Sequence, residues 1–140
     1  MNFLLAPAPG WAVSAALLLV RLVAGVAMVL HGWPKIQKPM EWMNSMPDPP
    51  PGFMQAIAAV FEVGGGVLLA LGLFTRAAAL AIAAVMVGAL ALVHIPKGDP
   101  FVSPGGPSCE PASVYLVLSL LMAVLGAGAY SLDAIVFRRR

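Results

Sequence analysis

Two charged residues stand inside apolar stretches of this 140-residue chain, and their spacing suggests that they meet. Arg21 follows Trp11 by ten residues, and Glu62 precedes Phe74 by twelve. At about 1.5 Å per helical residue, the two charges lie about 15 and 18 Å from the same edge of a membrane. Each charge alone would cost roughly 2.5–3.5 kcal/mol there, so we predict an Arg21–Glu62 ion pair. The pair would either fix the helix register or form part of a ligand or proton site.

A second group of polar residues lies near the opposite edge, about 27–30 Å away at the same rise per residue. His31 and His94 close two apolar stretches there, and Glu110 opens another. An imidazole at that depth can hydrogen-bond a quinone carbonyl and transfer a proton near neutral pH. The sequence therefore predicts a pocket for a quinone head group. The predicted catalytic residues are His31, His94 and Glu110. The predicted cofactor-binding residues are Arg21, Glu62 and Lys35.

Other interpretations of these polar residues stay open at this point. Both histidines would also be explained as polar helix ends that reach the membrane surface. Haem ligation by His31 and His94 is chemically feasible, and a metal bound by these two with Glu110 and Cys109 has suitable ligand types. Their spacing matches no recognised metal cluster, so we predict no metal site. Movement of a small anion past Arg21 is a further alternative.

The composition excludes an ordinary water-soluble domain. The chain is 61% hydrophobic and 10% charged, against roughly 45–50% and 25% in soluble domains. Its net charge of +2 comes from scattered residues, which argues against a nucleic-acid partner. A single cysteine, Cys109, excludes an internal disulfide. The lipid bilayer is therefore the expected surroundings of the chain.

Four stretches are apolar enough to position these residues as membrane-spanning helices: 11–33, 53–74, 77–95 and 112–130. We predict an all-α, polytopic four-helix bundle in a single transmembrane domain, 1–140. The second and third spans must be antiparallel neighbours because only a few residues join them. Proline-rich linkers, 34–52 and 96–111, should lie outside, with Pro34 and Pro96 ending their helices.

The ends of the chain and its small residues give two further expectations. The basic tail, Arg138 to Arg140, places both termini in the cytoplasm by the positive-inside rule. Small residues four apart allow helices to approach closely: Ala84 with Gly88, and Ser119 with Ala123. Such spacing suits contacts within the bundle, a homo-oligomer or other membrane subunits.

Several motifs, in order, resemble the DoxX family of small four-helix membrane proteins. They are Arg21, Gly25, His31-Gly32 and Lys35; Glu62-Val63-Gly64-Gly65-Gly66; Gly72-Leu73-Phe74-Thr75-Arg76; and Gly126-Ala127-Gly128-Ala129-Tyr130-Ser131-Leu132-Asp133. The family usually has an aromatic residue before the glutamate that opens the last helix, where this chain has Cys109-Glu110-Pro111.

The resemblance implies a multi-pass protein of a bacterial or archaeal plasma membrane that is associated with redox chemistry. Some family members are subunits of a thiosulfate:quinone oxidoreductase, and others join larger membrane assemblies. We therefore expect a small membrane oxidoreductase subunit linked to quinone, with a sulfur compound such as thiosulfate as the reductant. The rival hypothesis is a non-catalytic accessory or assembly subunit of a larger membrane complex.

Overall fold

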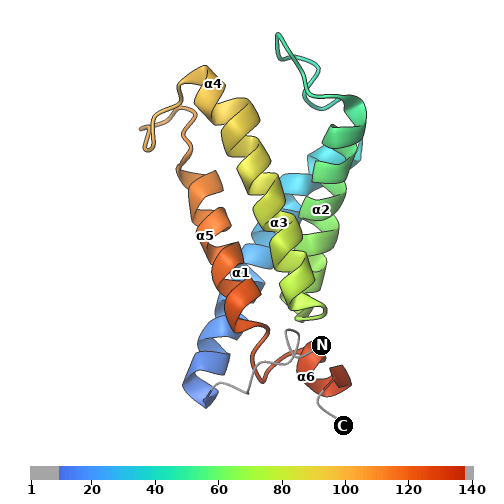
Figure 1. The fold of residues 1–140 in the computed structure, drawn as a ribbon, viewed down its shortest axis with the longest axis vertical. Helices are drawn as coiled ribbons and strands as arrows, with labels where there is room; N and C mark the ends of the chain where they lie inside the picture. The colour runs from blue at the N-terminus through green and yellow to red at the C-terminus, as the bar shows by residue number, and fades with distance from the viewer. Residues whose placement is uncertain (1–9, 138–140) are drawn as a thin grey trace.

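A computed structural model describes residues 10–137, and they form an all-α bundle (Figure 1). Three helices are long and apolar enough to cross a membrane: α1 (Trp11–Ile36), α2 (Gly52–Leu71) and the continuous helix Thr75–Lys97. This last helix comprises α3 (Thr75–Ala89), the π-helical turn η2 (Leu90–His94) and α4 (Ile95–Lys97). A shorter apolar helix, α5 (Glu110–Leu125), and the brief α6 (Leu132–Phe137) follow. The predicted all-helical membrane fold is confirmed.

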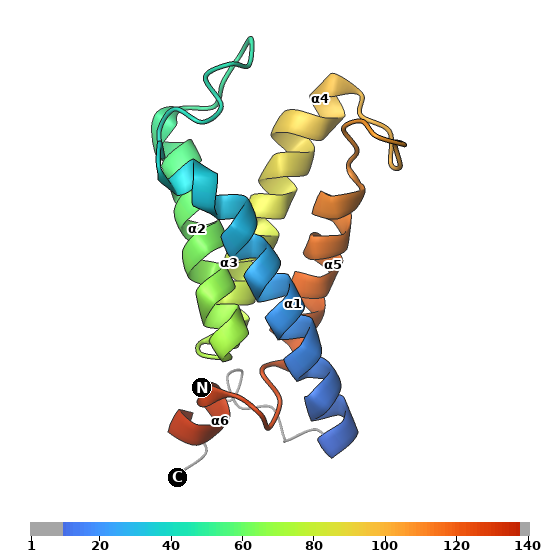
Figure 2. The same cartoon turned by 180° about the vertical axis from the view of Figure 1, so that it is seen from behind.

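Glycines let α1 and α2 approach to backbone contact. A Cβ added to Gly25 would lie 2.6 Å from the carbonyl oxygen of Gly66, and one added to Gly32 would lie 2.7 Å from Val63. These contacts fix the register of the two antiparallel helices. They also leave the first turns of α1 projecting beyond the end of α2, toward the level of α6 (Figure 2).

A tight turn joins α2 to α3, as the short linker predicted. Gly72 ends α2 with a φ of +67°, which glycine adopts without steric cost. The next helix begins at Thr75, where the carboxylate of Asp133 accepts hydrogen bonds from the backbone N–H groups of Phe74 (2.7 Å) and Thr75 (3.0 Å). The first turn of α6 thus caps α3 from outside, and the two helix ends are held together.

The helices close on a core of mixed aliphatic side chains and methionines. Its members come from α1, α2, α3 and α5: Ala24, Met28, Leu69, Ala79, Ile82, Met86, Ala112, Met122 and Ala123. Most of the remaining large apolar side chains are exposed. An apolar exterior is what a bilayer requires, because lipid replaces water around it.

Prolines do not end the helices where the sequence suggested. α1 continues through Pro34 to Ile36, and the third long helix continues through Pro96 to Lys97. Pro96 lacks the N–H that would pair with the carbonyl of Leu92, and its ring crowds that oxygen, which accounts for the wider turn at Leu90–His94. The prediction that both prolines stop their helices was wrong, because a proline near a helix end removes only one hydrogen bond.

The fourth helix is shorter than the predicted span 112–130. α5 ends at Leu125, because Gly126 adopts φ +79° and ψ −164°, a conformation that other residues avoid. The chain then runs without helix to Ser131 and packs on α1, where the hydroxyl of Ser14 accepts a hydrogen bond from Ala129 N (3.1 Å). The start of α1 and α6 lie at the same end of the bundle (Figure 1). The basic tail lies outside the described residues, and the side of the membrane that this end faces stays a prediction.

Candidate functional site

Glu62 pairs with Lys35, and the predicted Arg21–Glu62 ion pair does not form. Lys35 Nζ donates to Glu62 Oε1 at 2.7 Å. The Arg21 guanidinium is fully buried at the other end of the bundle, where Nη2 donates to the carbonyl oxygen of Tyr130. The prediction was wrong because it took Trp11 and Phe74 to lie at one level. The glycine contacts instead set Gly32 beside Glu62.

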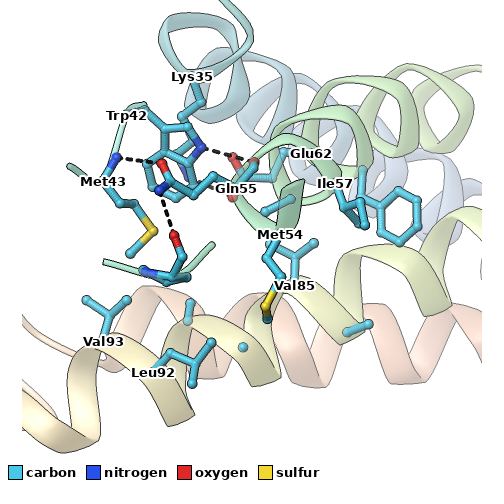
Figure 3. A pocket seen from close by; sticks show the side chains of 16 residues that line it. Lys35, Trp42, Met43, Met54, Gln55, Ile57, Glu62, Val85, Leu92 and Val93 are labelled. Atoms are coloured by element: carbon cyan, nitrogen blue, oxygen red, sulfur yellow. Dashed lines mark hydrogen bonds and ion pairs between the residues drawn. The ribbon is translucent and has the colours of Figure 1, made fainter. Parts of the chain in front are cut away.

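A pocket of about 270 Å³ opens beside the Lys35–Glu62 pair (Figure 3). It lies between α2, the helix α3–η2 and the chain that connects α1 to α2, which we call the 37–51 segment. Apolar side chains dominate its walls: Met43, Met54, Ile57, Phe61, Val85, Leu92 and Val93. Small residues, Ala58, Ala84, Gly88 and Ala89, complete the helical walls. The pocket therefore suits a largely apolar ligand with a few polar atoms.

The polar wall of the pocket is a buried ion pair with unused hydrogen-bonding capacity. The Glu62 side chain is 4% exposed and that of Lys35 is 23% exposed. Glu62 Oε2 is buried and has no hydrogen-bond partner. Lys35 Nζ also lies 4.6 Å from the centre of the Trp42 ring, a cation–π contact that holds the ammonium against the 37–51 segment. A carboxylate oxygen without a partner is a candidate acceptor for a ligand.

Gln55 fastens the 37–51 segment over the pocket. Its side-chain oxygen accepts a hydrogen bond from Met43 N (2.9 Å), and its amide nitrogen donates to Pro50 O (2.8 Å) and Asn44 Oδ1 (3.3 Å). Its backbone oxygen accepts a bond from Trp42 Nε1 (3.0 Å). One buried side chain thus bonds to the middle of the segment and to its C-terminal end. Gln55 shares the helical face of Glu62 in the sequence, but neither Gln55 nor Trp42 was a predicted site residue, since nothing in the spacing shows where the segment folds back.

The three residues predicted as catalytic do not line this pocket. His31 is exposed, with Nδ1 2.9 Å from the carbonyl oxygen of Ala27 and its ring 6.1 Å from that of Tyr115. His94 Nδ1 lies 2.8 Å from Asp99 Oδ2, and Glu110 is exposed at the start of α5. No hydrogen bond or ion pair joins the three. Of the six predicted site residues, the pocket brings together Lys35 and Glu62.

The residues considered as possible metal ligands do not lie together either. Within residues 10–137, no three His, Cys, Asp or Glu side chains are arranged to hold a metal ion. Cys109 is half-buried and has a free thiol. Arg21 borders no part of the described pocket, so the structure offers no support for an anion passing it there.

The opposite end of the bundle contains a polar cluster that the sequence showed only as motifs. A Cβ at Gly72 would coincide with the Arg21 guanidinium, so only glycine leaves room for that side chain. Arg76 Nη2 donates to the carbonyl oxygen of Val124 at 2.9 Å, and Asp133 caps α3. The motifs Gly72-Leu73-Phe74-Thr75-Arg76 and Ser131-Leu132-Asp133 thus meet and hold the end of the bundle together.

The family model described as DoxX matches residues 16–95, more than half of the chain. The chain belongs to the DoxX family. An uncharacterized protein of Haemophilus influenzae is 35% identical over 127 residues, which cover 86% of this chain and 90% of that protein. The putative oxidoreductase CatD of Bacillus subtilis is 30% identical over 124 residues, which cover 86% and 87% of the two chains. No solved structure matches this DoxX protein.

Proposed function

We propose that this membrane protein of the DoxX family is a quinone-linked redox subunit and that the pocket beside Lys35 and Glu62 binds the quinone head group. The observation that carries the proposal is the buried pair at the wall of an apolar pocket, with Glu62 Oε2 lacking a partner. A relative named as a putative oxidoreductase supports the redox part. The reductant would be a sulfur compound such as thiosulfate, oxidised by a partner subunit.

The size and chemistry of the pocket fit a single substituted ring. Its volume of about 270 Å³ is just below the roughly 300–1,000 Å³ of sites that enclose drug-sized ligands. Met54, Phe61 and Leu92 supply apolar walls for the faces of the ring. Lys35 keeps N–H donors beyond the one given to Glu62, so it can donate a hydrogen bond to a carbonyl oxygen.

The polar pair would supply the proton chemistry that a quinone needs. A bound quinone takes up two electrons and two protons to become a quinol, with the electrons coming from the sulfur compound through the partner subunit. In this chain Lys35 would orient the carbonyl, and Glu62 Oε2 would hold a proton near the ring oxygen. Gln55 and Trp42 keep the 37–51 segment in place, which limits access of water to the pair.

Binding of a quinone to the purified protein in lipid nanodiscs tests this function. A quinone should quench tryptophan fluorescence saturably, because Trp42 lines the pocket. Lys35→Met should weaken binding of the quinone, whose carbonyl accepts from Lys35, and Glu62→Gln should weaken binding of the quinol, whose hydroxyl donates to Glu62. Each affinity should fall by about tenfold, the effect of losing one charged hydrogen bond. Exposed neighbours, changed in the same way as Lys38→Met and Glu41→Gln, are matched controls and should bind normally.

An activity assay on the same variants separates the proposal from the accessory-subunit hypothesis. Quinone-dependent thiosulfate oxidation should appear when co-purifying membrane subunits are retained, and it should fall in the two pocket variants. An accessory subunit would leave this activity unchanged in Lys35→Met and Glu62→Gln and would bind no quinone by itself. Absence of saturable binding to the folded wild-type protein would refute the proposed function.

A further inference from the structure

Small residues on α3 form a notch in the wall of the pocket. Ala84 and Gly88 both line the pocket, and a Cβ added to Gly88 would meet no atom within 4 Å. The sequence suggested that this pair serves close helix packing, but at Gly88 the structure shows open space. Across the pocket, Ile57 and Phe61 of α2 are exposed on the outer surface of the bundle. The wall between α2 and α3 is therefore thin, apolar and open to the surroundings.

The opposite wall of the pocket is closed. Gln55 is 2% exposed and Met43 is 8% exposed, and both are held by the hydrogen bonds of the 37–51 segment. Trp42 lies against Lys35 on the same side (Figure 3). A ligand thus meets hydrogen-bonded chain on one side of the pocket and small or apolar side chains on the other.

The notch lies at the depth of the hydrocarbon. Gly88 is twelve residues beyond Arg76 in one continuous helix, about 18 Å along its axis, whereas the hydrocarbon of a bilayer is about 30 Å thick. Glu62 stands near the middle of α2, ten residues after Gly52. Its buried Oε2 has no hydrogen-bond partner among residues 10–137, which points independently to a ligand in this pocket. Acyl chains, rather than water, surround the notch.

We propose that the notch at Ala84 and Gly88 is a lateral portal through which the apolar tail of the bound quinone extends into the bilayer. This proposal rests on the function proposed above and narrows the substrate class to membrane-dissolved quinones with a hydrocarbon tail. The head group lies beside Lys35 and Glu62, and the tail leaves between α2 and α3. Entry and release then occur within the membrane, without passage through the 37–51 segment.

A matched pair of glycine variants tests the portal. Gly88→Leu fills the notch, whereas Gly64→Leu adds the same side chain to α2 at a glycine that also meets no atom within 4 Å but does not line the pocket. Two quinones with the same head group, one with a decyl tail and one without, are titrated in nanodiscs. Quinone concentrations are expressed per mole of lipid, so that the stronger partitioning of the decyl quinone into the bilayer does not affect the comparison of the two affinities.

We expect Gly88→Leu to weaken binding of the decyl quinone by about tenfold, the loss of roughly two methylene contacts. It should weaken binding of the tail-free quinone by a clearly smaller factor, because the head group lies beside Lys35 and Glu62 and the added side chain fills the notch that the tail would use. Gly64→Leu should leave both affinities unchanged. An equal loss for both quinones, or no loss for either, would overturn the portal while leaving the head-group site intact.

A second measurement tests the portal independently of quinone binding. In a protein with Trp11→Phe and Trp33→Phe, Trp42 is the remaining tryptophan of the chain and lines the pocket. Lipids brominated at mid-chain should quench its fluorescence if acyl chains enter the notch. Gly88→Leu should reduce this quenching, and Gly64→Leu should not. Equal quenching in wild type and Gly88→Leu would contradict a portal at this place, whatever the result with quinones.

Discussion

Lys35 and Glu62 stabilise each other at the wall of the pocket, so removing one charge should cost more than removing both. The Glu62 carboxylate is 4% exposed and its Oε1 lies 2.7 Å from Lys35 Nζ. In Lys35→Met the carboxylate stays buried and loses the hydrogen bond that Lys35 donates. The double variant Lys35→Met/Glu62→Gln removes both charges and should recover most of the lost stability.

The magnitude follows from the burial of the pair. Breaking a fully buried ion pair costs about 3–5 kcal/mol. Because Lys35 keeps 23% of its side chain exposed, water screens part of the interaction, and we expect a loss of about 2 kcal/mol in Lys35→Met. Interhelical hydrogen bonds in a membrane protein couple by about 0.6 kcal/mol on average. A coupling energy of about 1–2 kcal/mol between Lys35 and Glu62 would therefore identify a charged pair.

Reversible unfolding in mixed detergent micelles, followed by circular dichroism, gives the four free energies of the double-mutant cycle. A second cycle with Arg21→Met and Glu62→Gln is the control, because Arg21 has other partners and should show coupling near zero. If Arg21 rather than Lys35 coupled to Glu62, the register set by the glycine contacts would be incorrect. If neither did, the pair would not contribute to folding, and the reasoning about its burial would be refuted.

Three further predictions concern the parts of the fold that hold the pocket and its opposite end. Asp133→Ala should lower the unfolding free energy by about 1 kcal/mol, measured in the same detergent assay, because α3 loses its two capping hydrogen bonds; an unchanged midpoint would contradict this. Gly25→Ala should cost about 1–3 kcal/mol because the added methyl meets backbone atoms of α2, whereas Gly64→Ala, where the methyl meets no atom, should be neutral or slightly stabilising. Gln55→Leu should leave the helical content unchanged but should speed protease cleavage within the 37–51 segment, since the segment loses its side-chain hydrogen bonds; equal cleavage rates would show that other contacts hold it.

Composition was sufficient to predict the fold class, and chain length between spans was sufficient to predict one helix pair. The apolar excess requires a bilayer, and the linker of a few residues before Thr75 leaves α2 and α3 no arrangement except an antiparallel hairpin. The length of the fourth helix was not predictable in this way. Gly126 lies inside an apolar run, and the sequence shows neither its positive φ nor that a Cβ there would lie 3.3 Å from Arg76 Nε.

The partner of Glu62 could not be predicted from the spacing, because depth along a helix was measured from the ends of the apolar runs. The register of α1 on α2 is set where glycines leave no side chain between the two helices, so that their backbones can touch. This contact is made by Gly25 and Gly66. Arg21 and Lys35 are 14 residues apart, so moving α1 by about four turns relative to α2, roughly 21 Å, exchanges Arg21 for Lys35 as the nearest cation. The glycines were visible in the sequence, but their pairing across the two helices was not.

The molecule has two polar ends, and the family motifs are divided between them: Lys35 and Glu62 line the pocket, whereas Gly72, Arg76 and Asp133 lie at the opposite end. At the end opposite the pocket, Arg21 donates to the carbonyl oxygen of Tyr130 and Asp133 caps α3, contacts that join chain segments, and a Cβ at Gly72 would displace the guanidinium. The pocket residues from Lys35 to Val93 all lie within the stretch 16–95 that matches the DoxX family, whereas Glu110 lies beyond it. A function that depends on the pocket therefore needs only α1, α2, the helix α3–η2 and the 37–51 segment. On this argument α5 and α6 support the bundle, and changes at Glu110 should affect stability before they affect ligand binding.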